Sequence, residues 1–317
     1  SILINTDYVV LDQGTGCVHT APGHGEDDYH AGLEYGLDIY SPVGPSGHFD
    51  ETAGQYHGKE IFKANPEIVE DLRTRNRLVY ADKIQHSYPH CWRCKKPVIF
   101  RATEQWFIAM DTADLRKKAL EQIKKTQWLP GWGEERIYSM VANRPDWCIS
   151  RQRDWGVPIP VFYCGDCGEA LVSVEAVEKT VEQFRAHGSD SWYTKDIAEF
   201  LPAGTTCAKC GSSHFEKGKD IVDVWFESGS SLNVAENYPL HRFPPKLYME
   251  GGDQYRGWFH SSLLVGVSAK DRAPYDTVIC HGWALDNKGR AMSKSLGNVI
   301  RPQTIINQKG AEILRLW

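Results

Sequence analysis

The chain has 317 residues, 41% of them hydrophobic and 24% charged, which is the composition of a globular protein with two or three domains. The 36 basic and 41 acidic residues give a formal net charge of −5, which argues against capture of nucleic acid by overall charge but allows a local basic face. No apolar run is long enough to span a membrane, and the first residues lack a signal-peptide pattern.

Cysteine usage indicates metal ligation in a reducing compartment, so we expect a cytoplasmic protein. Six of the nine cysteines stand in Cys-x-x-Cys pairs, a spacing that favours metal binding over disulfides in a long chain. The chain begins without Met and ends inside a helical pattern after Pro302, so we also expect an internal segment of a longer protein. The apolar positions of that pattern are Ile305, Ile306, Ile313, Leu314 and Trp317.

Residues 1–85 are rich in Gly and carry short strand patterns. We expect strands at residues 8–11 and 17–20, and a helix that begins at Asn65–Pro66. The apolar positions of this helix are Ile68, Val69 and Leu72.

A polar cluster in the same region consists of His19 and the segment 23–29, which includes Asp27 and Asp28. Carboxylates beside a His can grip an ammonium group or position a water molecule. Acidic residues at the start of a helix are also an ordinary capping arrangement. The residues alone leave both interpretations open.

Residues 86–156 are expected to contain strands near 98–100 and 105–108, and a helix that Asp111 caps. The apolar face of this helix is Leu115, Ala119 and Ile123. The segment 146–156 combines two Arg with two Trp. These residue types can bind phosphate and stack on bases, or they can build a core turn linked by Arg–Asp pairs, and the two interpretations have equal weight.

Two cysteine pairs, Cys164–Cys167 and Cys207–Cys210, predict a structural zinc site, because two such turns supply the four thiolates of a closed tetrahedral site. They frame an insertion at residues 157–222 whose helix carries Val177, Val181 and Phe184. A third pair, Cys91–Cys94, has no evident partner. It is half of a zinc site completed upstream of residue 1, a pair of reduced surface thiols, or a redox pair.

Residues 223–229 are expected to run from a strand into a turn of small residues. A strand at 246–249, a helix at 255–268 and a strand at 277–280 then alternate, which predicts a parallel sheet with a crossover helix. Ligands of such sheets lie beyond the carboxyl ends of the strands. The polar segments 250–254 and 281–283 stand at those ends.

The segment Met292-Ser293-Lys294-Ser295 is a loop of small residues around one lysine. Such a lysine can close over a triphosphate and neutralise the charge that develops as a phosphorus centre is attacked. The alternative is a solvated loop, and the four residues alone do not decide between the two.

Six blocks of the chain, in order, resemble the class I aminoacyl-tRNA synthetases, and residues 100–107 resemble their isoleucyl branch. The blocks are residues 14–25, 100–107, 143–153, 223–229, 250–259 and 292–295. The resemblance implies an α/β protein: the second half of a class I synthetase Rossmann fold, with part of a β-rich editing domain and a zinc-knuckle insertion. The implied division is the end of the editing domain at 1–85, a return into the catalytic domain at 86–156, the zinc-binding insertion at 157–222, the second Rossmann half with the Met-Ser-Lys-Ser loop at 223–300, and the start of the helical region that leads to the anticodon-binding domain at 301–317.

The implied activity is ATP-dependent activation of isoleucine, transfer to tRNA-Ile and hydrolytic editing of mischarged valine, by an enzyme that is a monomer at full length and uses ATP, Mg²⁺ and Zn²⁺ without membrane contact. By the same resemblance Lys294 would be the catalytic lysine, Trp225 would border the amino-acid pocket, and His19 and Asp28 would belong to the editing pocket. The residues implied to bind ATP or the aminoacyl-adenylate are Glu250, Gly251, Asp253, Gln254, His281, Gly282, Met292, Ser293 and Ser295.

The chain departs from the family at Ala291, where Lys is usual, and at Gly252, where Ser is common. The His-Ile-Gly-His motif and the Thr-rich editing strand are expected upstream, so these 317 residues alone are expected not to form the adenylate. The alternatives are a valyl- or leucyl-type relative, an editing-only aminoacyl-tRNA deacylase fragment, and a non-catalytic zinc module that binds RNA.

Overall fold

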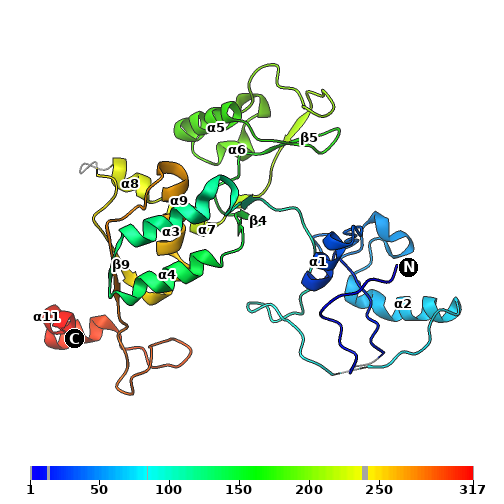
Figure 1. The fold of residues 1–317 in the computed structure, drawn as a ribbon, viewed down its shortest axis with the longest axis horizontal. Coiled ribbons are helices and arrows are strands. Elements are labelled where there is room, and N and C mark those ends of the chain that lie inside the picture. The colour runs from blue at the N-terminus through cyan, green and yellow to red at the C-terminus, as the bar shows by residue number, and fades with distance from the viewer. Residues whose placement is uncertain (1, 13–14, 84, 238–241, 317) are drawn as a thin grey trace. The chain divides into compact units, whose positions relative to one another are not determined.

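The computed structural model describes residues 2–12, 15–83, 85–237 and 242–316. The chain forms two compact units, residues 1–104 and residues 105–317 (Figure 1). None of the helices in the described ranges is long and apolar enough to cross a membrane.

The first unit consists of helices and irregular segments. Its helices are α1 (Glu26–Glu34), the 3₁₀ helix η1 (Glu51–Tyr56) and α2 (Ile61–Thr74). The strands predicted at 8–11, 17–20 and 98–100 are wrong, because within the described residues none of these segments joins a strand ladder, and Leu11 and Val18 are exposed. A strand is stabilised by pairing and by one covered face, and a strand-like composition supplies neither.

Helix α2 begins at Ile61, before the start predicted at Asn65–Pro66. The Glu60 carboxylate accepts hydrogen bonds from the backbone N–H groups of Phe62 (3.1 Å) and Lys63 (3.2 Å). This side chain therefore caps the helix and sets its first residue. Pro66 lies inside the helix.

The second unit contains the predicted parallel sheet. Strands β9 (Leu247–Gly251) and β10 (Thr277–His281) pair in parallel, which confirms the two predicted strands. A third strand that the sequence did not predict, β2 (Gln127–Leu129), pairs in parallel with the other side of β10. The fully buried Val278 lies in register between Trp128 and Tyr248 at the centre of the sheet.

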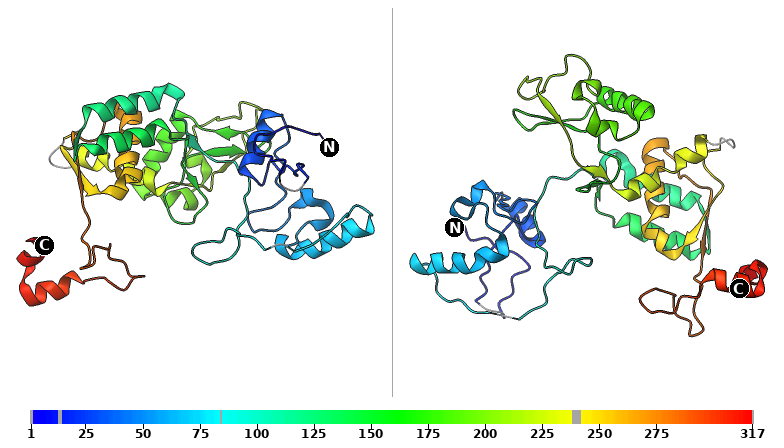
Figure 2. Two further views of the ribbon diagram at one scale, coloured as in Figure 1. Left: turned by 60° about the horizontal axis from the view of Figure 1, so that its bottom comes forward. Right: turned by 180° about the vertical axis from the view of Figure 1, so that it is seen from behind.

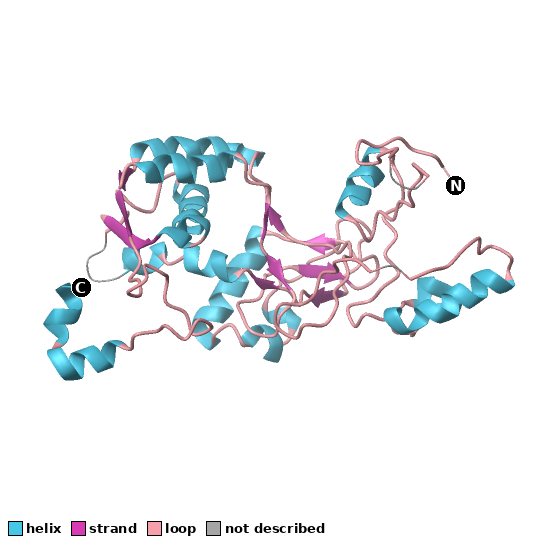
Figure 3. Ribbon diagram, turned by 90° about the horizontal axis from the view of Figure 1, so that it is seen from below, coloured by secondary structure: helices cyan, strands magenta, loops and turns pink. Residues whose placement is uncertain are grey.

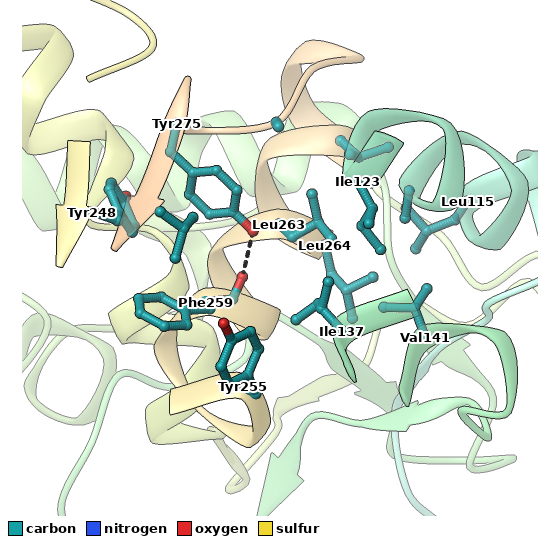
Figure 4. Close-up of a cluster of buried hydrophobic side chains, with 14 of the residues drawn as sticks. Leu115, Ile123, Ile137, Val141, Tyr248, Tyr255, Phe259, Leu263, Leu264 and Tyr275 are labelled. Atoms are coloured by element: carbon teal, nitrogen blue, oxygen red, sulfur yellow. Dashed lines mark hydrogen bonds between the residues drawn. The ribbon is translucent and has the colours of Figure 1, made fainter. Parts of the chain in front are cut away.

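Helices cover this sheet and form the main hydrophobic core (Figure 4). They are α3 (Leu115–Lys125), α4 (Trp132–Ala142) and the crossover helix α9 (Trp258–Lys270), which follows the 3₁₀ helix η4 (Gly252–Arg256). The apolar face predicted for α3 is confirmed, since Leu115, Ala119 and Ile123 are all buried. Tyr275 donates a hydrogen bond of 2.9 Å to the Phe259 carbonyl oxygen inside the core (Figure 4).

The cap predicted for α3 is wrong. Asp111 makes no capping hydrogen bond, because the 3₁₀ turn η2 (Thr112–Asp114) separates it from the helix. Its carboxylate instead pairs with Arg116, with Oδ1 2.7 Å from Nε. This ion pair lowers the pKa of Asp111 through the hydrogen bond from Arg116.

The chain enters and leaves the cysteine-framed insertion at adjoining points of the second unit. The short strands of this unit are drawn in magenta in Figure 3. Strand β4 (Ser150–Arg151) pairs with β8 (Ile221–Val222), and β1 (Phe107–Ile108) pairs with β3 (Trp147–Cys148). The insertion itself holds the antiparallel strands β5 (Phe162–Cys164), β6 (Ala170–Leu171) and β7 (Phe215–Lys217), with helices α5 (Val174–His187), α6 (Ser191–Thr194) and η3 (Ile197–Glu199).

The insertion has a core of its own around the buried Trp192, against which Phe162 and Phe200 pack. The predicted helix is α5, and its buried positions are Ala176 and Thr180. Val181, which was predicted on the apolar face, is 40% exposed.

Two predictions near the end of the chain are wrong. Residues 224–229 form helix α7 (Val224–Gly229) and not a strand, because Asp223 accepts a hydrogen bond from Trp225 N and starts a helix. The pattern after Pro302 is two helices, α10 (Pro302–Lys309) and α11 (Ala311–Leu316), because Gly310 breaks it with a φ of +86° (red in Figure 2). Helix α8 (Leu232–Asn237) follows α7, and Trp317 lies outside the described residues.

Candidate functional site

The carboxyl ends of β9 and β10 lie side by side. Glu250 pairs in register with Cys280, and Gly251 pairs with His281. The side chains of Glu250 and His281 are exposed, and His281 Nδ1 lies 2.7 Å from the carbonyl oxygen of Gly282. The structure therefore brings the two polar segments predicted at strand ends to one edge of the sheet.

Gly251 allows the chain that follows β10 to fold over the end of β9. A Cβ atom at Gly251 would lie 3.0 Å from the Trp283 ring and 2.9 Å from Asp253 Oδ1. Any larger residue would push both groups away. The indole of Trp283 and the carboxylate of Asp253 are thus close neighbours of the strand end.

Gly257 likewise allows the Trp225 ring to pack closely against the backbone. A Cβ atom at Gly257 would lie 2.8 Å from the Trp225 ring and 2.5 Å from Gln254 Oε1. The same Gln254 oxygen accepts a hydrogen bond of 2.9 Å from the backbone N–H of Trp258, at the start of α9. Trp225 and Gln254 are therefore brought together, next to the strand end that carries Glu250.

The lysine loop is a tight turn with Lys294 at its tip. Ser293 Oγ lies 3.1 Å from Ser295 Oγ and accepts a hydrogen bond of 3.2 Å from Leu296 N. The backbone N–H of Gly297 donates to the carbonyl oxygen of Lys294 (3.3 Å). The Lys294 side chain is exposed and has no hydrogen bond or ion pair with any described residue. Its role as the catalytic lysine stays a prediction.

The four predicted zinc ligands converge. The sulfur atoms of Cys164, Cys167, Cys207 and Cys210 all lie within 4.8 Å of one another. Four thiolates at about 2.3 Å from a tetrahedral zinc ion require similar spacings, so the donor set and its geometry fit zinc. A backbone hydrogen bond from Cys210 lowers the pKa of Cys207 to about 7.

Each pair forms the same knuckle. The N–H of Gly168 donates to Cys164 O (2.9 Å), and the N–H of Gly211 donates to Cys207 O (2.8 Å). Both glycines have positive φ, +73° and +76°, a conformation that favours Gly. The sequence did not single these glycines out.

The third pair has this knuckle too. Cys91 N donates a hydrogen bond of 2.8 Å to Lys96 O, and Lys95 N donates one of 2.8 Å to Cys91 O. Lys95 has a φ of +60°. Backbone hydrogen bonds from Cys94 and Arg93 lower the pKa of the Cys91 thiol. Across the described ranges, the only group of three or more candidate metal ligands is the four-cysteine site.

The two halves of the segment 146–156 differ: the first forms a core turn, and the second is exposed. The Asp223 carboxylate accepts a hydrogen bond from Trp147 Nε1 (3.1 Å) and pairs with Arg151 Nη2 (3.0 Å), which is the Arg–Asp core turn. Trp155, by contrast, is 93% exposed, and Arg153 is exposed beside it. The second half of the segment is therefore exposed, whereas the first half is held by Asp223.

A cavity of about 340 Å³ lies between this turn and α9. Its lining includes Trp225, Gly257, Arg144 and His260. The His260 side chain is only 5% exposed and its Nε2 has no partner among the described residues. Burial, and then the charge of Arg144, lower the pKa of His260 to about 4, so the imidazole is neutral at pH 7.

Residues 24–317 match the family model of "tRNA synthetases class I (I, L, M and V)". The chain belongs to this family. Strand ends that carry Glu250 and His281, followed by the Lys294 loop, are therefore parts of a class I synthetase.

The synthetase chain is similar in sequence to isoleucine–tRNA ligases. It is 56% identical to the isoleucine–tRNA ligase of Kosmotoga olearia and 54% identical to that of Geobacter sulfurreducens, over 100% of this chain and 34% of each relative. The chain thus spans about a third of the length of these relatives. Among solved structures, methionyl-tRNA synthetase of Mycobacterium tuberculosis bound to methionyl-adenylate matches 93% of this chain and 54% of its own, with 15% identity and a TM-score of 0.44.

The first unit of the synthetase chain has a cavity of about 490 Å³ lined in part by Cys17, His19 and Thr20. Asp28 accepts hydrogen bonds from Ala21 N (2.9 Å) and from the Tyr8 hydroxyl (3.0 Å). The structure therefore ties Asp28 to the segment that carries His19, although no contact between the two side chains is recorded within the described residues. Gly14, the first residue of that sequence block, lies outside them.

Sequence reasoning missed Asp286 and Asn298 of the synthetase loop. The Asp286 side chain is 7% exposed, and its Oδ2 accepts a hydrogen bond of 2.9 Å from Asn298 Nδ2. Gly289 and Gly297, both at positive φ, mark the turns that bring these residues together. These glycines were the available signal, but a turn in sequence does not reveal its side-chain partners.

Proposed function

We propose that this chain is part of an isoleucine–tRNA ligase, which activates isoleucine with ATP and transfers it to tRNA-Ile. The single observation that carries the proposal is the edge at which the parallel strands that carry Glu250 and His281 end side by side, ahead of the Lys294 loop. The 53–56% identity of the whole chain to isoleucine–tRNA ligases supports isoleucine as the substrate. The cytoplasm is the expected compartment, and the full-length enzyme is expected to be a monomer.

The reaction joins the isoleucine carboxylate to the α-phosphorus of ATP and releases pyrophosphate. Negative charge grows on the phosphate oxygens during this attack, and the Lys294 ammonium, with Mg²⁺ brought by the nucleotide, would neutralise it. The exposed Glu250 carboxylate is suited to accept hydrogen bonds from the ribose hydroxyls. Gly251, Asp253 and Gln254 would line the same side.

The other predicted residues fit roles around this centre. His281 and Gly282 would lie on the adenine and ribose side, and Met292, Ser293 and Ser295 would shape the closing loop. Trp225, packed on Gly257, would border the isoleucine side chain. Zinc, when bound by Cys164, Cys167, Cys207 and Cys210, would hold the insertion together and have no open position for catalysis.

The domain assignment is part of the proposal. Residues 1–85 would end the editing domain, 86–156 would return into the catalytic domain, 157–222 would be the zinc insertion, 223–300 the second Rossmann half and 301–317 the start of the helical region. Cys91 and Cys94 would be half of a second zinc site, which their knuckle geometry supports.

The experiment is isoleucine-dependent exchange of labelled pyrophosphate into ATP by a full-length ligase that carries these 317 residues. We expect isoleucine to support exchange, valine to support it more weakly, and Glu250→Ala to slow it at least 10-fold. Exchange that depends on leucine or valine in preference to isoleucine would contradict the proposal. The separate chain is expected to show no exchange.

A second candidate function, hydrolysis of Val-tRNA-Ile alone, is favoured by the cavity that His19 lines. Because one methylene allows only limited discrimination, an isoleucine-activating enzyme needs such a step as well. Hydrolysis of mischarged tRNA by the 317-residue chain without any adenylation partner would favour the editing-only alternative. Loss of that hydrolysis in Asp28→Ala, with exchange retained in the full-length ligase, would assign Asp28 to editing.

A further inference from the structure

The segment before the lysine loop is a small hairpin organised around one carboxylate. Leu285 forms an isolated antiparallel bridge with Ala291, and Asp286 N donates to Arg290 O (2.8 Å). Asp286 Oδ1 accepts from Lys288 N and from Arg290 N, each over 2.9 Å. Its Oδ2 accepts from Arg290 Nε (3.0 Å) and lies 2.8 Å from Arg290 Nη2.

Asn298 connects this hairpin to the lysine loop. Its Nδ2 donates to Asp286 Oδ2 (2.9 Å) and to the carbonyl oxygen of Ala291 (3.2 Å). Its Oδ1 accepts from the backbone N–H of Ser293 (2.9 Å), the residue directly before Lys294. One amide side chain thus bonds the carboxylate, the end of the hairpin and the start of the loop.

The hydrogen bonds of Asp286 and Asn298 require a carboxylate at the first position and an amide at the second. Asp286 must be a carboxylate, because five donor groups face its two oxygens. The hydrogen bond from Asn298, followed by the bond from the Arg290 backbone, lowers the pKa of Asp286 to about 2. Position 298 must both donate and accept, which an amide does and a carboxylate or an alkyl group does not.

We propose that Asp286 and Asn298 are positioning residues that hold the Lys294 turn and the 285–291 hairpin as one unit, so that the Lys294 ammonium is presented in a fixed direction. The inference rests on the proposed role of Lys294 in adenylation. The two residues act through Lys294 and touch no substrate themselves. Loss of the Asp286 carboxylate or of the Asn298 amide would let the turn move, although Lys294 itself would be unchanged.

The kinetic test uses a full-length ligase that carries these residues and measures isoleucine-dependent pyrophosphate exchange. Asp286→Asn and Asn298→Ala should each lower kcat roughly 10- to 100-fold with the KM for isoleucine unchanged, since displacements near 1 Å in an active site have effects of this order. In a Lys294→Ala background the same substitutions should lower kcat less than about 3-fold further. Asn287→Ala, at an exposed position of the same turn, is the matched control and should retain the parental rate.

The outcomes separate the two proposals. If Lys294→Ala is strongly impaired while Asp286→Asn stays within about 2-fold of the parent, the positioning role is overturned and the proposed function stands. If the effects multiply in the Lys294→Ala background, the residues do not act through Lys294 and the inference is overturned as well. If Lys294→Ala itself is near normal, the proposed function of Lys294 fails, and the positioning role fails with it.

Amide hydrogen exchange of the 317-residue chain supplies a readout that needs no activity. The amides of Lys288, Arg290 and Ser293 should be protected, and Asn298→Ala should expose that of Ser293. If these amides exchange at unprotected rates in the parental chain, the proposed positioning role of Asp286 and Asn298 is overturned directly.

Discussion

The Asp223 carboxylate lies 3.0 Å from the Arg151 guanidinium and at the same time caps helix α7, so one side chain ties the turn at 146–151 to the helix that carries Trp225. Asp223 is 6% exposed on its side chain, and its Oδ2 also accepts from Trp147 Nε1. The relationship explains how Trp225, which we propose borders the amino-acid pocket, is held by a segment far from it in sequence.

Asp223→Ala should lower the free energy of unfolding by roughly 2–4 kcal/mol. The substitution removes the cap and leaves Arg151 and Trp147 Nε1 without their acceptor, although the partial exposure of Arg151 limits the cost. Denaturant unfolding of the chain measures the change. Asp154→Ala, an exposed carboxylate of the same segment, should change stability by less than about 0.5 kcal/mol. A similar small effect for Asp223→Ala would contradict the assignment.

Zinc analysis of the purified chain should find one tightly bound ion. Cys207→Ser should lose it and destabilise the insertion, because three thiolates no longer close the site. Cys91→Ser is the matched control, since its knuckle has no second pair within the described ranges, and it should retain the ion. Zinc that persists in Cys207→Ser, or that is lost in Cys91→Ser, would refute the predicted ligand set.

The successes and failures of the sequence predictions have physical causes. Ile123 and Ala119 were placed correctly because a buried helix face repeats every three to four residues. Strands at 8–11 and 17–20 failed because strand composition does not supply a pairing partner. The convergence of the four cysteines could be predicted because the Cys-x-x-Cys spacing itself encodes the knuckle.

The sequence predicts which residues stand at the candidate site better than it predicts the contacts between them. The strand ends at Glu250 and His281 follow from alternation of strands and helices. The partnership of Asp286 with Asn298 depends on two turns that fold back on each other, which no periodicity reports. Asp223 was read as part of a strand because Val224, Trp225 and Phe226 favour strands locally, whereas its capping oxygen starts a helix.

Acidification should destabilise the second unit in part through His260. Its pKa is about 4 in the folded chain against 6.5 for the ordinary group, so the unfolded chain binds more protons between these values. The free energy of unfolding should therefore fall as pH is lowered from 6.5 to 4, by up to about 3 kcal/mol from this residue. Below pH 4 the contribution levels off.

Unfolding in urea at pH 7 and pH 4.5 isolates this contribution when the parental chain is compared with His260→Asn, because all other titrating groups are shared. The variant should lose less stability on acidification than the parent. His187→Asn, at an exposed histidine, should behave like the parent. Equal pH dependence in parent and His260→Asn would show that the imidazole is not buried in the neutral form.

The central claim is that Lys294 stabilises the triphosphate as isoleucine attacks. The most direct measurement is isoleucine-dependent pyrophosphate exchange by the full-length ligase carrying Lys294→Ala, with Lys309→Ala, an exposed lysine of α10, as control. We predict a fall in kcat of roughly 100-fold or more for Lys294→Ala, the size expected when one group that stabilises transition-state charge is removed, with zinc content and the control unchanged. A rate within a few-fold of the parental enzyme would contradict the account.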